Sequence, residues 1–292
     1  MSERSQSAVP VFRIKPPRRD NQSAPPVTLK PEFAAYDQLY GHEGLMNLTV
    51  EDLLKEMDEW GMRGSILQAE HDEHAWGGDE EWNDRVAEII TAHPEYFVTG
   101  FAGVDPRRGM DAVREVDRAY HDLHMRGVVF EPAFLEISPT DPRCYPIYSK
   151  CVELGIPVGF HTGINFSSHG PLIYERPVLI DQVACHFPEL VIICHHGGWP
   201  WPMESVAVAW KHRNVYLEFG AISPKYLAHS GGWGDTLHFM DSLIREQVLF
   251  GTDWPMLRYE RTLSEVASLG LKDTTVDAYL GGNAQRLLDR IL

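Results

Sequence analysis

The sequence VIICHHGG at residues 191–198 joins a short apolar run to two histidines and two glycines. A short run of this kind, rich in Val and Ile, is typical of a strand buried on both faces. Two further segments share the pattern: IPVGFHTG at residues 156–163 and VLFGTD at residues 248–253. Parallel strands end at one edge of a sheet, so the polar residues that follow the three runs are expected at a common site.

Strands and helices are predicted to alternate from residue 49 onward. A strand over residues 11–15, stopped by Pro16 and Pro17, is the first of eight expected strands. The remaining strands are predicted near residues 65–69, 97–103, 127–130, 157–161, 191–195, 215–219 and 248–251. Most of them start about thirty residues apart with a helical segment between, as a (β/α)8 TIM barrel of the α/β class requires. An open doubly wound sheet is the alternative, but no glycine-rich phosphate loop follows the first strand.

The chain is interpreted as a single barrel domain with an extended N-terminal arm. Residues 1–31 form this arm, which is rich in proline and basic residues and includes the possible first strand. Residues 32–292 form the catalytic barrel domain.

Composition limits the classes of partner and compartment. The net charge is −16, from 26 basic and 42 acidic residues, which disfavours nucleic acid and points to a small-molecule substrate. No apolar run approaches the ~18 residues of a membrane span, so no membrane association is expected. The cysteines lack CxxC spacing and are interpreted as reduced thiols of a cytoplasmic protein. They are Cys144, Cys151, Cys185 and Cys194.

Strand ends supply the candidate site residues. His161 follows an apolar run, where an imidazole is either a metal ligand or a buried core residue. Of the adjacent His195 and His196, only one can enter the barrel mouth, and His196 is chosen because Gly197 follows it. Asp253 is expected to bind a metal, pair with a cation or exchange a proton, because a buried carboxylate is otherwise costly.

Other titratable residues are weaker candidates. Glu131 ends the fourth strand. It is interpreted as a general acid/base or a metal ligand, with a solvated loop carboxylate as the alternative. The loop at residues 70–74 is rich in ligand atoms but is expected at most to form the rim of the site. His121, His124 and His186 are expected on the surface.

Six motifs give the chain its resemblance to a known family. They are YPIY (145–148), GIP (155–157) leading to HTG (161–163), HGGWPW (196–201), SPKY (223–226), LFGTDWP (249–255) and NAQRLL (283–288). With them, residues 36–290 resemble the amidohydrolase superfamily. The nearest branch includes aminocarboxymuconate semialdehyde decarboxylase, the resorcylate-type decarboxylases and some carbon–carbon hydrolases.

The resemblance implies roles for several residues. His161 matches a metal ligand, Asp253 a residue that ligates metal or shuttles a proton, and His196 a residue that contacts substrate. It also implies a divalent metal, zinc or manganese, and a possible homodimer. The family's His-x-His pair at strand one is missing, and Arg13 and Lys15 stand in its place. Neither side chain can ligate a metal in its protonated form, so a protein without a cofactor is the alternative.

The expected activity is hydrolysis of a C–C or acyl bond in a small carboxylated or aromatic metabolite. Hydrolysis is favoured because the segments around His161 and Trp199 resemble relatives that hydrolyse β-keto substrates, and Trp199 is assigned to substrate binding. With a metal, His161 and Asp253 would hold the ion. Without one, Arg13 and Lys15 would bind the substrate anion, and acid–base work would fall to the following residues. They are Asp253, Glu131 and His196. The alternatives are a non-oxidative decarboxylase (a carboxy-lyase) and a metal-free, non-catalytic barrel.

Overall fold

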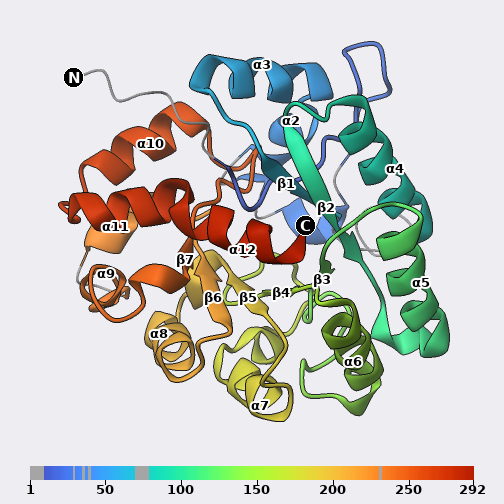
Figure 1. Cartoon of the computed structure of the whole chain (residues 1–292). Coiled ribbons are helices and arrows are strands. Elements are labelled where there is room, and N and C mark those ends of the chain that lie inside the picture. Colours follow the sequence, from blue (N-terminus) through green and yellow to red (C-terminus); the bar gives the residue numbers. More distant parts are fainter. Residues whose placement is uncertain (1–9, 29, 35–36, 39–40, 70–78, 230–231) are drawn as a thin grey trace.

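A computed structural model describes residues 10–28, 30–34, 37–38, 41–69, 79–229 and 232–292 (Figure 1). The described residues form a parallel sheet of seven strands, ordered as they occur in the chain. The strands are β1 (Ser65–Gln68), β2 (Phe97–Gly103), β3 (Val128–Phe130), β4 (Val158–His161), β5 (Ile192–His195), β6 (Val215–Glu218) and β7 (Val248–Leu249). The loop at residues 70–74 lies outside the described residues.

Residues 11–15 occupy the eighth strand position and close the barrel between β7 and β1. The N–H of Phe12 donates to the carbonyl of Phe250 at 2.8 Å, and the N–H of Ile66 donates to the carbonyl of Val11 at 3.0 Å. The predicted first strand is therefore present as a paired segment, although only an isolated bridge residue, Ile14, has regular pairing. The (β/α)8 prediction is confirmed.

The pairing of this segment is irregular, and the irregularity matters for the site. Val11 and Ile14 accept hydrogen bonds from Ile66 and Gln68, so three steps along one segment match two steps along β1. An extra residue of this kind breaks the strand's alternation, as in a β-bulge. The side chain of Arg13 is consequently buried at the ends of the strands, with 1% of its surface exposed.

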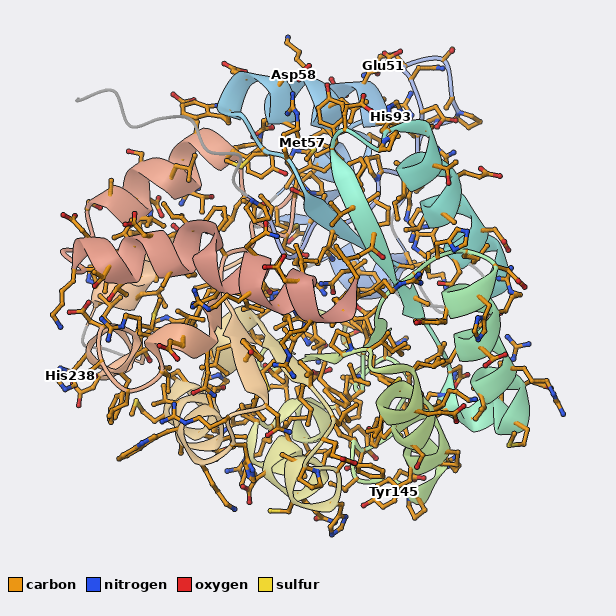
Figure 2. All side chains as sticks on the ribbon, in the orientation of Figure 1. Glu51, Met57, Asp58, His93, Tyr145 and His238 are labelled. Atoms are coloured by element: carbon orange, nitrogen blue, oxygen red, sulfur yellow. The ribbon has the colours of Figure 1, made fainter. Side chains whose placement is uncertain are left out.

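Helices surround the sheet (Figure 1). They are α2 (His42–Met46), α3 (Val50–Trp60), α4 (Asp79–Ala92), α5 (Met110–His121), α6 (Tyr145–Leu154), α7 (Val178–His186), α8 (Pro202–Lys211), α9 (Thr236–Met240), α10 (Tyr259–Ala267), α11 (Asp273–Asp277) and α12 (Asn283–Ile291). Helix α3 begins at a capping box of Thr49 and Asp52 and ends at left-handed Gly61, as its sequence predicts. It turns Met57 toward the core and leaves Asp58 outside (Figure 2).

The barrel interior is apolar at one end only. Phe12, Ile66, Phe101 and Leu249 cluster there with residues of α12, and Figure 1 shows α12 lying across that end of the barrel. Beyond this apolar cluster, the interior side chains become polar toward the carboxyl ends of the strands. The fold therefore leaves the carboxyl end for chemistry, as in other barrels.

Several other predictions are tested by the described residues. The four cysteines are unpaired thiols, three of them buried. His121, His124 and His186 are exposed, as expected. Among the described helices, none has both the length and the apolar character needed to cross a bilayer. The proposed boundary between residues 1–31 and 32–292 stays a prediction.

Candidate active site

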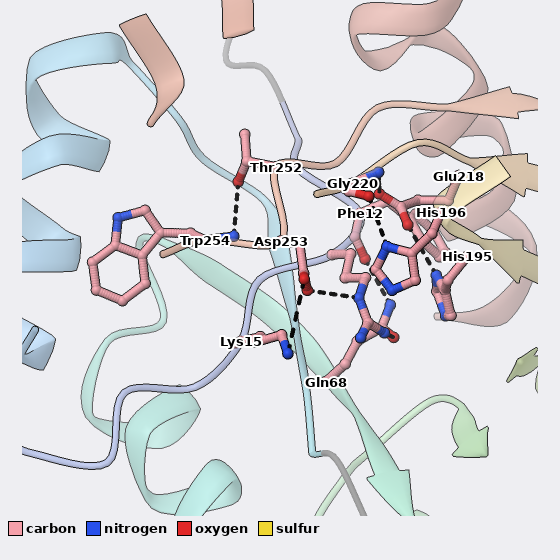
Figure 3. Close-up of polar contacts among 11 residues, drawn as sticks. Phe12, Lys15, Gln68, His195, His196, Glu218, Gly220, Thr252, Asp253 and Trp254 are labelled. Atoms are coloured by element: carbon pink, nitrogen blue, oxygen red, sulfur yellow. Dashed lines mark hydrogen bonds and ion pairs between the residues drawn. The ribbon is translucent and has the colours of Figure 1, made fainter. Parts of the chain in front are cut away.

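Arg13, Lys15 and Asp253 form a buried cluster of charges at the carboxyl end of the barrel (Figure 3). Nε of Arg13 donates to Oδ1 of Asp253 at 2.8 Å, and Nη1 of Arg13 donates to Oε1 of Gln68 at 3.1 Å. Nζ of Lys15 lies 3.8 Å from Oδ2 of Asp253. Each oxygen of the carboxylate thus faces its own cation.

The backbone and the charge state of Asp253 are both unusual. Its φ of +53° lies in the left-handed region, which non-glycine residues seldom adopt and which often marks a functional position. Its N–H donates to the carbonyl of Arg13 at 3.2 Å. Burial by itself raises the pKa of Asp253, but the charges of Lys15 and Arg13 outweigh burial and lower this pKa below 3.8. Asp253 is therefore anionic at neutral pH.

His161 lies at the barrel mouth and is held by a carboxylate that sequence reasoning missed. Its Nδ1 lies 2.8 Å from Oε2 of Glu175, which is fully buried in the loop after β4. The other oxygen of Glu175 accepts the N–H of Ala133 at 2.9 Å. A carboxylate bound to Nδ1 fixes the imidazole's orientation and leaves Nε2 for a substrate, a proton or a metal.

His196 lies next to His161 at the mouth, with the two rings tilted by 54°. The two ring centroids are 4.6 Å apart. Nδ1 of His196 lies 2.7 Å from the carbonyl of Gly220, so Nδ1 carries the proton and Nε2 is an acceptor. Burial, then the charges of His161 and Arg13, lower the pKa of His196 well below 6.5. His196 is therefore a neutral imidazole at neutral pH.

His195 lies behind this mouth, in the sealed interior of the barrel. Its Nδ1 lies 3.1 Å from Oε2 of Glu218, and both side chains are completely buried. Burial raises the pKa of Glu218 to about 8. Sequence reasoning missed Glu218, although it ends the apolar run VYLE of β6 in the same way that Asp253 follows the run VLFGT. Gln68 ends the run SILQ of β1 in the same way and was also missed, whereas Glu175 had no such signal.

Glu131 and Trp199 are placed differently from the charged cluster. Glu131 is buried directly after β3, which argues against a solvated loop carboxylate. Trp199 is 37% exposed, and its backbone packs against Gly163, two residues beyond His161. Its assignment to substrate binding, like the catalytic assignment of Glu131, stays a prediction.

The residues around Asp253 do not form an ordinary site for zinc or manganese. Cationic groups of Arg13 and Lys15 already face both carboxylate oxygens, so a divalent ion there would meet two positive charges at close range. Among the described residues, one group of three possible ligands comes together, on the outer helix α7 and just after the end of α8. That group is Asp181, Cys185 and His212. Its Asp181 already pairs with Lys211.

Comparison with known proteins identifies the family. The amidohydrolase family model matches residues 32–290, and the chain therefore belongs to this family. The match confirms the resemblance predicted from the six motifs. A search of curated proteins found no match to this sequence.

Solved structures with the same fold cover nearly the whole chain. An uncharacterized TIM-barrel protein from Bordetella bronchiseptica has a TM-score of 0.78 and 25% identity, covering 98% of this chain and 99% of its own. A 2,6-dihydroxybenzoate decarboxylase from Rhizobium has a TM-score of 0.68 and 17% identity, with coverages of 96% and 99%. A 5-carboxyvanillate decarboxylase from Novosphingobium aromaticivorans, complexed with manganese and 4-hydroxy-3-methoxy-5-nitrobenzoic acid, has a TM-score of 0.69 and 14% identity, with coverages of 98% and 97%.

Proposed function

We propose that this protein is a non-oxidative decarboxylase of a small hydroxylated aromatic, or similarly conjugated, carboxylic acid. The observation that carries the proposal is the cation pair of Arg13 and Lys15 around the single carboxylate of Asp253. Similarity to decarboxylases of aromatic acids supports it further. Hydrolysis, the activity favoured from the sequence, is not supported by these relatives.

The charge balance of the cluster suits an anionic substrate. Among Arg13, Lys15 and Asp253 there are two positive charges and one negative charge, so one further carboxylate makes the cluster neutral. Lys15 is the more accessible cation, with 18% of its side chain exposed against 1% for Arg13. In this proposal Lys15 meets the substrate carboxylate first, and Arg13 completes a charge-assisted contact.

The reaction itself needs a stabilised anion and one proton: R–COO⁻ and H⁺ give R–H and CO2. The C–C bond breaks, and its electron pair stays on the ring carbon, where a new C–H bond forms. The two cations, with positions fixed by the fold, stabilise the negative charge that develops. In this proposal they take the place of a divalent ion such as the manganese with which the Novosphingobium enzyme is complexed.

Asp253 is the proposed proton donor, and substrate binding makes this possible. At rest Lys15 and Arg13 hold its pKa low. A substrate carboxylate beside the same two cations repels the charge of Asp253, and its pKa rises so that it takes up a proton. The proton is replaced through His161, whose Nδ1 is held by Glu175 at the mouth.

His196 is proposed to orient the substrate. Its Nε2 is the acceptor nitrogen, because Nδ1 donates to the carbonyl of Gly220. A hydroxyl group next to the carboxylate would donate to Nε2, which increases the electron density of the conjugated system. A neutral acceptor nitrogen at this position favours hydroxylated acids over unsubstituted ones.

The test is a CO2-release assay on metal-analysed protein. Hydroxybenzoic acids, including 2,6-dihydroxybenzoate and 5-carboxyvanillate, would be supplied before and after dialysis against a chelator. We expect equal amounts of CO2 and decarboxylated product, substoichiometric divalent metal by elemental analysis, and no loss of rate after chelation. Asp241→Asn, which removes a carboxylate bonded to Lys272 outside the barrel, is the matched control for an Asp253→Asn variant in the same assay.

Each contrary result has a distinct meaning. Stoichiometric zinc or manganese together with chelator inhibition would overturn the substitution of cations for metal. Hydrolytic products without CO2 would restore the activity favoured from the sequence. Binding of the acids without any turnover would instead point to a non-catalytic barrel.

A further inference from the structure

We propose that Glu218 is a positioning residue for His196, acting through the backbone of Gly220. Glu218 lies in the sealed interior at the end of β6 and has no assigned role in the reaction. The inference rests on the proposed function only where it assigns the substrate contact to His196.

The backbone of one residue, Gly220, links the two side chains. The N–H of Gly220 donates to Oε1 of Glu218. The carbonyl of Gly220 accepts the proton of Nδ1 of His196 at 2.7 Å. The N–H and the carbonyl of Gly220 belong to successive peptide planes, so the bond to Glu218 holds the first plane and helps to hold the backbone conformation that aims the carbonyl at Nδ1. The bond to Nδ1 fixes which ring nitrogen of His196 is the acceptor, and therefore what Nε2 can do at the mouth (Figure 3).

The surroundings of Glu218 are shaped to its carboxylate. A Cβ atom at Gly251 or at Gly220 would overlap Oε1 of Glu218, so both neighbouring positions require glycine to leave room. The second oxygen, Oε2, is occupied by Nδ1 of His195 at 3.1 Å. The carboxylate therefore has one arrangement, held from two sides.

Keeping a carboxyl group here is energetically unfavourable, which argues for a function. The side chain is completely buried, and burial raises its pKa to about 8. Nε2 of its partner His195 is buried without a hydrogen-bond partner. Groups that are costly to bury and still present are commonly tied to an active site.

The test compares Glu218→Ala with Glu218→Gln in protein labelled with ¹⁵N-histidine, in the absence of substrate. Side-chain ¹⁵N shifts report the tautomer of each histidine, and the His195→Gln and His196→Gln variants assign the signals. In Glu218→Ala, His196 is expected to lose its single Nδ1–H tautomer. Glutamine keeps an oxygen for the N–H of Gly220 and presents an amide donor to His195. The protonated Glu218 presents an O–H donor to His195 in the same place, so Glu218→Gln should preserve the tautomers of both histidines.

A kinetic measurement separates positioning from simple loss of stability. With an acid that the wild-type enzyme decarboxylates as substrate, kcat of Glu218→Ala should fall by roughly tenfold or more with little change in KM. In Glu218→Gln, most of the wild-type kcat should be recovered. Glu115→Gln is the control, because Glu115 is a buried carboxylate bonded to Arg118 in the helical layer. Its kcat should equal that of wild type.

The outcomes decide the proposal even if the reaction is different. Unchanged His196 signals in Glu218→Ala would overturn it. If the alanine variant does not fold, Glu218→Met takes its place, because methionine fills a similar volume without an acceptor for the N–H of Gly220, and unchanged His196 signals in that variant would likewise overturn the proposal. The histidine spectra need no turnover, so an enzyme without decarboxylase activity would contradict the proposed function and leave this inference standing or failing independently.

Discussion

Two histidine–glutamate pairs lie on neighbouring strands, and they differ mainly in burial. Nδ1 of His161 is 2.8 Å from Glu175, and Nδ1 of His195 is 3.1 Å from Glu218. The two histidines are direct partners in the register of β4 and β5. The exposed fraction of the surface of His161 is 9%, whereas that of His195 is 0%. The same pair of side chains thus occurs once at the mouth and once behind it.

Burial separates the chemistry open to the two pairs. In the sealed pair, burial, then the charges of Arg13 and His196, lowers the pKa of His195 well below 6.5, and burial raises that of Glu218 to about 8. Both shifts favour uncharged forms, which suits a pair that holds geometry. The pair at the mouth has access to protons and substrate, so it can take part in the reaction.

The largest effect is expected on the mouth side, at Asp253. Asp253→Asn should lower kcat by about three orders of magnitude, because an amide cannot carry the proton to carbon. The asparagine oxygen can still accept the bond from Nε of Arg13, so the fold should remain intact. Steady-state kinetics and a thermal melt would measure both. Near wild-type turnover would remove Asp253 from the mechanism.

The next effect concerns the cations that complete the mouth. Arg13→Ala should raise KM for carboxylated substrates and cost roughly 2–4 kcal/mol in kcat/KM. Lys15→Ala should cost less, since its Nζ lies 3.8 Å from Asp253 whereas Nε of Arg13 lies 2.8 Å away. Arg261→Ala, which alters an exposed ion pair on α10, is the control. An Arg13→Ala variant with wild-type kinetics would show that the cation cluster is not used.

Making the same substitution at the histidine of each pair sharpens the comparison. His161→Gln should lower kcat by about a hundredfold with a small change in stability. His195→Gln should instead lower the free energy of unfolding by roughly 2–3 kcal/mol, because it disturbs a fully buried hydrogen bond. Kinetics and urea unfolding of both variants give a two-by-two result. If the sealed variant lost more activity than the mouth variant, the assignment of roles would be reversed.

The smallest effect is a pH dependence of stability that arises in the sealed pair. Glu218 has a pKa of about 8 in the folded chain and an ordinary value of 4.5 when unfolded. The folded state therefore holds an extra proton between these values, and the free energy of unfolding falls as pH rises through this window. His195 and His196 contribute stability that is lost only below 6.5, where the unfolded chain takes up protons.

The window from pH 6.5 to 8 consequently isolates Glu218. Over it, wild-type protein should lose about 1–2 kcal/mol, whereas Glu218→Gln should show little change. Urea unfolding at several pH values measures the slope. Equal slopes in both proteins would show that Glu218 is ionised throughout, contrary to its burial.

Much of the fold was predictable because its signals are local. Apolar runs such as VIICHHGG identify buried strands wherever they fold, and their spacing predicts a barrel. Helices α2, α10 and α11 were not predicted from the sequence. The same logic found Asp253, His161 and His196, which directly follow or end such runs. It could have found Glu218, which ends β6.

The sequence by itself determined the barrel and the strand-end residues, because the pattern of apolar and polar residues is written into each short segment. Only the tertiary structure decided which side chains meet. Arg13 and Asp253 are 240 positions apart, and Glu175 reaches His161 from a loop that has no recognisable pattern. Protonation follows the same division. Burial and neighbouring charge set whether a carboxylate is ionised, and both exist only once distant segments have packed together.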